Sequence, residues 1–154
     1  MEGFYYAEKE GVIVGTNTLW TSFVGGSVAT IAYLLGGVDE LIKALGIVMV
    51  VDFTLGLSVA YLVKKDVESR KAFKGLLKKS AMMLMVIVAV QLDKVTDSGD
   101  FMRNAMILFL IGMEGISFIE NLGKLGIKVP SFIKNAFTQL QMDNDDKSKD
   151  GEGK

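Results

Sequence analysis

Apolar residues are grouped into long runs along the chain, and the charged residues are gathered between these runs. No charged residue lies between Glu10 and Asp39, none lies between Ser80 and Leu92, and only Asp52 interrupts the stretch 44–63. A soluble helix distributes its charges so that one face stays hydrated, whereas about 20 apolar residues in a row can cross a bilayer. The pattern therefore predicts an all-α integral membrane protein.

We expect about four short transmembrane helices. The uninterrupted apolar segments place them at about 12–35, 41–63, 76–95 and 105–122. The third span is the weakest of the four, since its uncharged part is short.

The sequence after the last span has a different pattern. Ile133, Phe137 and Leu140 recur at helical spacing after Pro130, which predicts an amphipathic helix over 131–141. The expected organisation is therefore an N-terminal surface segment (1–11), a helical membrane domain (12–140) and a disordered polar tail (142–154).

One connection is strongly basic and predicts the orientation in the membrane. Its cations, opposed only by Asp66 and Glu68, are Lys64, Lys65, Arg70, Lys71, Lys74, Lys78 and Lys79. Short loops rich in Lys and Arg stay in the cytoplasm. With four spans, both termini of this multi-pass protein are then expected in the cytoplasm.

Composition narrows the function. The mean hydropathy is +0.37, and the 154 residues contain no cysteine and no histidine and carry a net charge of −1. The commonest general base and metal ligand is thus missing, and no global basic field attracts nucleic acid. We expect no enzyme, no catalytic residue, no metal site and no cofactor; a hydrolase would depend on carboxylates alone.

Carboxyl groups inside the apolar runs are the main candidates for function. Asp52 and Glu114 lie at the centres of the second and fourth spans, where a charge costs ~2.5–3.5 kcal/mol. We expect no Lys or Arg at their depth, so they should be protonated or face water in an assembly, or else hydrogen-bond a neighbouring helix. The intramembrane polar and gating candidates are Asp52, Asp93, Glu114, Ser117, Glu120 and Asn121.

Small residues suggest where helices pack closely. Ser22, Gly26 and Thr30 repeat every fourth residue in the first span, and Gly56 and Ala60 share the face of Asp52 in the second. Both are ordinary packing devices in membrane helices.

Short motifs across most of the chain resemble the toxin-secretion/phage-lysis holin family of phages and prophages of Gram-positive bacteria. The order and spacing of the motifs are more specific than any one of them. The matching segments are the run from 36–39 to Ala44-Leu45, the Asp-aromatic-x-x-Gly pattern in 51–56, the basic segment 69–79, the last-span motif 114–121 and the segment 125–130 that follows the last span.

The resemblance implies a protein that times host-cell lysis. Such proteins oligomerise in the host cytoplasmic membrane and form lesions that release a cytoplasmic endolysin or, in some relatives, large toxins. The implied partners are other copies of the chain, the lipid bilayer, an endolysin without direct contact and, in some systems, an antiholin. The alternatives are a small ion channel or transporter subunit, and a scaffold that docks partners through the C-terminal amphipathic helix.

Overall fold

The computed structural model describes the backbone of residues 2–64 and 68–149, and the side chains of 18–63 and 68–142. All regular elements in these ranges are helical. The chain divides into two units, 1–37 and 38–154.

The first unit contains one helix, α1 (Glu2–Leu34). It ends where Gly36 and Gly37 adopt φ of 75° and 106°, a conformation that side chains with a Cβ rarely take. Gly37 N–H donates to Ala32 O at 2.9 Å and closes the last turn. Ser27 and Thr30 donate their hydroxyls to carbonyl oxygens of α1 itself.

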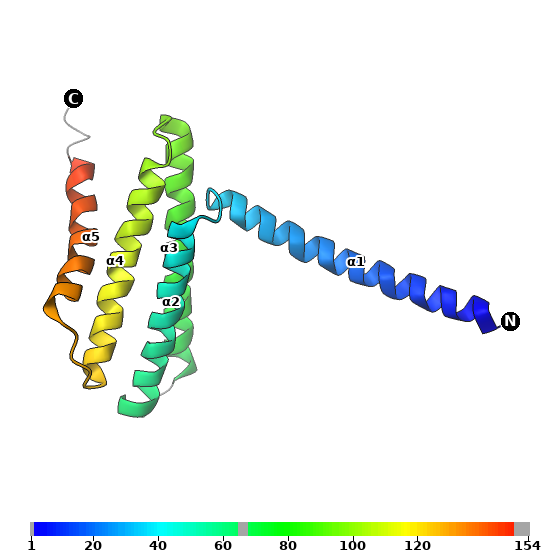
Figure 1. Ribbon diagram of the computed structural model, residues 1–154, viewed down its shortest axis with the longest axis horizontal. Helices are drawn as coiled ribbons and strands as arrows, with labels where there is room; N and C mark the ends of the chain where they lie inside the picture. Colours follow the sequence, from blue (N-terminus) through cyan, green and yellow to red (C-terminus); the bar gives the residue numbers. More distant parts are fainter. Residues whose placement is uncertain (1, 65–67, 150–154) are drawn as a thin grey trace. The chain divides into compact units, whose positions relative to one another are not determined.

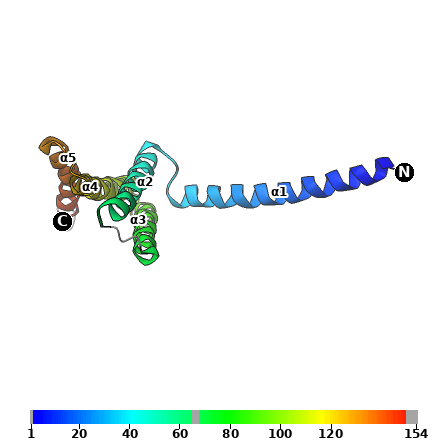
Figure 2. The ribbon, with the colours of Figure 1, turned by 90° about the horizontal axis from the view of Figure 1, so that it is seen from below.

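The second unit is a bundle of four helices (Figure 1). They are α2 (Glu40–Val59), which continues as a π-helical turn (Ala60–Lys64), α3 (Ser69–Thr96), α4 (Phe101–Lys124) and α5 (Ser131–Lys149). Seen from below, α4 lies between α5 on one side and α2 and α3 on the other (Figure 2). The central helix α4 therefore positions the other three.

Three helices of the described residues are long and apolar enough to cross a membrane: Glu40–Val63, Ser69–Thr96 and Phe101–Lys124. They correspond to the expected second, third and fourth spans. The expected first span, 12–35, begins among residues whose side chains lie outside the described ones, which start at 18, and it remains a prediction.

The core of the bundle is small and the apolar outer surface is large. Leu45, Val86, Ile107 and Leu110 are fully buried where α2, α3 and α4 meet. Large apolar side chains are exposed on α2 and α3, among them Ile47, Val50, Leu84 and Val88. Soluble monomers rarely expose apolar surface on this scale, so these faces suit lipid.

Several helix ends differ from the sequence-based boundaries. The helix α3 begins at Ser69 rather than 76, because its basic first half is rich in Lys, Arg, Ala and Leu, which favour helix. The helix α5 continues to Lys149 rather than ending at 141, so residues 142–149 are helical where a disordered tail was expected. A helix already nucleated by packing adds one hydrogen bond for each residue that it gains.

Candidate functional site

Three charged residues lie at the same depth in the three apolar helices. Asp52 is 11 residues before Val63, Lys79 is 10 residues after Ser69, and Glu114 is 10 residues before Lys124. At 1.5 Å per residue these side chains lie about 15 Å from the same end of the bundle. Since a hydrocarbon layer is about 30 Å thick, the three residues are near its middle.

Lys79 is shared by both carboxylates. Its Nζ donates to Asp52 Oδ2 at 3.1 Å and also to Glu114 Oε2. The side chains of Lys79, Asp52 and Glu114 are only 14%, 10% and 4% exposed. The expectation that no Lys or Arg reaches this depth was therefore wrong: one residue of the basic segment turns inward from α3.

An amide extends this network along α4. Asn121 Nδ2 donates to Asp52 Oδ1 at 3.1 Å, and Lys124 Nζ donates to Asn121 Oδ1 at the same distance. The backbone of α2 approaches here, since a Cβ added at Gly56 would lie 3.5 Å from Asn121 Nδ2. Asp52 thus joins α2 to α3 and α4 through one carboxylate.

The network is costly to bury and costly to break. Two carboxylates and one ammonium give it a charge of −1 when all three are ionised. Removing one partner of a buried ion pair typically costs about 3–5 kcal/mol, although the intact pair itself adds little net stability. The arrangement therefore specifies which helices meet and at what register, more than it strengthens the fold.

A cavity of about 260 Å³ adjoins the network. Residues of α2, α3 and α4 line it, including Ser117 and Ala60, and Lys71 and Lys78 stand on its α3 side. It lies between the network and the end of the bundle that carries the basic first half of α3. The charged network therefore borders an open space on this one side.

A second polar cluster lies at the other end of the three helices. Asp93 accepts the backbone N–H groups of Met102 and Arg103 at 2.9 and 2.8 Å and the hydroxyl of Ser98 at 2.6 Å, and so caps the start of α4. The Arg103 side chain is only 2% exposed, and its Nη1 donates to Asp39 Oδ2 at 2.7 Å.

Asp39 also begins α2, because its side chain accepts the N–H of Ile42 at 3.0 Å. The hydrogen bond from Arg103, supported by that from Ile42, lowers the pKa of Asp39 to about 2. The cluster thus fixes the starts of α2 and α4 together.

The remaining candidates are distributed as follows. Glu120 is exposed rather than part of the network. Arg70, Lys71, Lys74 and Lys78 belong to the first half of α3 rather than to a loop. Lys64 ends the π-helical turn, and Lys65 lies outside the described residues. The stripe Ser22, Gly26 and Thr30 lies on α1, where its role in helix packing remains a prediction.

Three contributors to the contacts between these helices were not predicted from the sequence. Lys79 looked like one more topology-determining cation, and Arg103 like the end of a connection. The third is a glycine pair in α4, Gly112 and Gly115, on which Phe137 of α5 packs. The sequence did contain a signal for Lys79 and Arg103, because each lies at a similar distance from a helix end as the carboxylate that it contacts.

Three apolar helices that enclose an ion network define a multi-pass helical membrane protein. Comparison with known proteins names its family: a model of the bacteriophage holin family matches residues 29–142, which is most of the chain. The chain belongs to this family.

Individual relatives agree with the family match. A probable holin of Bacillus phage phi105 is 34% identical over 130 residues, covering 84% of this chain and 94% of that protein. An uncharacterized protein of Listeria innocua is 38% identical over 108 residues (70% of this chain, 76% of the relative). One of Clostridium perfringens is 31% identical over 146 residues (94% and 98%). No solved structure is significantly similar to the chain.

Proposed function

We propose that this protein is a holin that assembles in the bacterial cytoplasmic membrane into lesions and thereby times lysis of the host cell. The lesions let a cytoplasmic endolysin reach the cell wall without direct contact between the two proteins. A large toxin is a second cargo that such lesions would release. An antiholin would act by binding this protein.

The observation that carries the proposal is the buried network of Asp52, Lys79 and Glu114. In a single bundle the ions satisfy one another, and the outer faces of α2 and α3 suit lipid. In a larger assembly that encloses water, hydration could replace these partners, because a solvated charge no longer needs a buried counter-ion. The same residues therefore support both a quiet, packed state and a state in contact with water.

Orientation follows from the basic residues. With the junction of α2 and α3 in the cytoplasm, α4 ends in the cytoplasm and α5 begins there. The C-terminus is then cytoplasmic when α5 lies along that surface. The position of the N-terminus depends on residues 12–35: if this segment crosses as a fourth span, the N-terminus is cytoplasmic as well. The cluster of Asp39, Asp93 and Arg103 then lies at the outer surface.

The proposal is tested by co-expressing the chain in bacteria with an endolysin that lacks an export signal. We expect an abrupt fall in culture density after a quiet delay, and no fall when either protein is omitted. Continued growth, with the chain shown to be inserted in the membrane, would contradict the proposal and favour a selective channel.

A further inference from the structure

Helices α4 and α5 are closely packed at two glycines of α4. Gly112 and Gly115 of α4 are buried beneath α5. A Cβ added at Gly115 would clash with the ring of Phe137, and one added at Gly112 would lie 2.9 Å from the Phe137 carbonyl oxygen. Any larger residue at these positions would displace α5. The glycines thus form a notch for Phe137.

The notch lies deep in the membrane part of α4. Gly112 is 12 residues before Lys124, about 18 Å from that end of the helix. The helix α5 runs back alongside α4 (Figure 1), so Gln141 reaches the level of Gly112. In this position α5 stands upright at the depth of the hydrocarbon layer.

Its composition does not suit lipid at that depth. The helix α5 is not among the three helices apolar enough to span a membrane. Asn135 and Gln139 are each two residues from Phe137, which places them on the opposite side of the helix, and both are exposed. Polar side chains that face hydrocarbon without a partner cost several kcal/mol in total.

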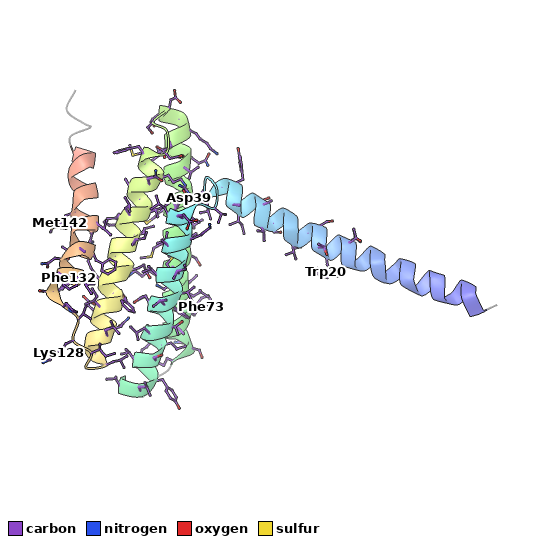
Figure 3. All side chains as sticks on the ribbon, in the orientation of Figure 1. Trp20, Asp39, Phe73, Lys128, Phe132 and Met142 are labelled. Carbon is purple, nitrogen blue, oxygen red and sulfur yellow. The ribbon has the colours of Figure 1, made fainter. Side chains whose placement is uncertain are left out.

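Phe132 and Met142 are also exposed on α5, at the two ends of this segment (Figure 3). Between them the outward side carries Asn135 and Gln139, whereas Ile133, Phe137 and Leu140 are partly buried. The upright position is therefore favourable only where water, rather than lipid, lies beside α5.

We propose that α5, docked in the Gly112–Gly115 notch, lines the water-filled lumen of the lesion with its Asn135–Gln139 side. In the quiet protein α5 leaves the notch and lies along the membrane surface, where an amphipathic helix is stable. Docking of α5 is then part of opening. This inference rests on the proposed function, since it assigns a lining to the proposed lesion.

The first test compares two Phe→Ala variants of the same helix in vesicles loaded with a protein cargo. Phe137→Ala removes the side chain that fills the notch, while Phe132→Ala removes one that is 71% exposed. We expect release of the cargo to fall about tenfold or more with Phe137→Ala, which corresponds to about 1.4 kcal/mol of docking free energy. Phe132→Ala should stay within about twofold of wild type.

The second test reports docking directly. Lys134 of α5 is exposed and offers a cleavage site for trypsin. A helix held against α4 is cleaved more slowly than the same helix free of α4, because cleavage requires local unfolding. We expect rapid cleavage of α5 at low protein density in the vesicles and slow cleavage at densities that release cargo.

Each outcome has a separate meaning. Faster release by Phe137→Ala, or cleavage of α5 at equal rates in quiet and leaking vesicles, would overturn the inference, because α5 would then act as a cover or a fixed support. Release by wild type that Phe137→Ala leaves unchanged would also overturn it. Absence of release by wild type at any density would refute the proposed function itself, and the inference with it.

Discussion

Replacing Lys79 by methionine tests whether the shared ion network specifies the bundle. The variant keeps an unbranched side chain of similar length but removes the ammonium group that contacts both Asp52 and Glu114. Lys74→Met is the matched control, since Lys74 is exposed on the same helix and its loss removes the same charge from the same flank. Comparing the two variants separates the effect of losing the ion network from the effect of removing one positive charge from the basic segment.

The expected cost follows from the geometry. Both carboxylates contact one nitrogen, so they lie at most about 6 Å apart, and at an effective dielectric constant of about 20 their repulsion is roughly 3 kcal/mol. This value agrees with the 3–5 kcal/mol typical of removing one partner from a buried pair. We therefore expect Lys79→Met to lower the free energy of unfolding by about 3 kcal/mol, and Lys74→Met by less than about 0.5 kcal/mol.

Denaturation of the purified protein in a mild detergent, followed by circular dichroism, measures these differences. Adding Asp52→Asn and Glu114→Gln to Lys79→Met should restore most of the stability, since no charge is then buried. Equal stability of Lys79→Met, Lys74→Met and wild type at neutral pH would refute the reasoning.

Three further predictions concern the lysis delay and the two other contacts. Asp52→Asn and Glu114→Gln keep the shape of each side chain but remove its ionisation, so each should change the lysis delay; an unchanged delay in both would exclude ionisation as part of timing. Asp39→Asn keeps a helix-capping side chain but loses the charge paired with Arg103. It should lower the free energy of unfolding by about 1 kcal/mol at pH 7, a small value because Asp39 is half exposed and solvent screens the ion pair. Since the folded pKa of Asp39 is about 2 and its ordinary value is 3.8, this difference, measured by denaturation, should be full above about pH 4 and vanish as the pH falls through 2. Gly115→Ala should weaken the α4–α5 contact, detected as faster proteolysis of α5 in detergent; proteolysis at the wild-type rate would contradict the close packing of Phe137.

The helices were largely predictable, because a continuous apolar run is a strong signal of a membrane span. The residues at which the helices begin and end were less predictable. The apolar run marks the part of α3 that suits lipid, whereas its helix begins earlier, in a basic segment that favours helix on its own. Likewise α4 begins at Phe101 rather than 105, because Asp93 accepts N–H groups from its first turn.

The site was predictable in part. A carboxylate isolated in an apolar run is conspicuous, and Asp52 and Glu114 were found for this reason. Which cation meets them depends on the register of three helices, and a single sequence contains no direct record of that register. Seven basic residues close together all looked alike, and only the packing of α3 against α2 and α4 turns Lys79 inward. Arg103 is a similar case, since its partner Asp39 begins a different helix.

Passage of a folded protein through a membrane that contains only this chain tests the account most directly. Vesicles of bacterial lipids would be loaded with a small dye and an active endolysin, and the purified chain would be reconstituted at increasing density. We expect both cargoes to be retained at low density and released together above a threshold. Release of the dye, or of ions alone, while the endolysin stays inside at every density would contradict a lesion-forming holin and identify a selective channel.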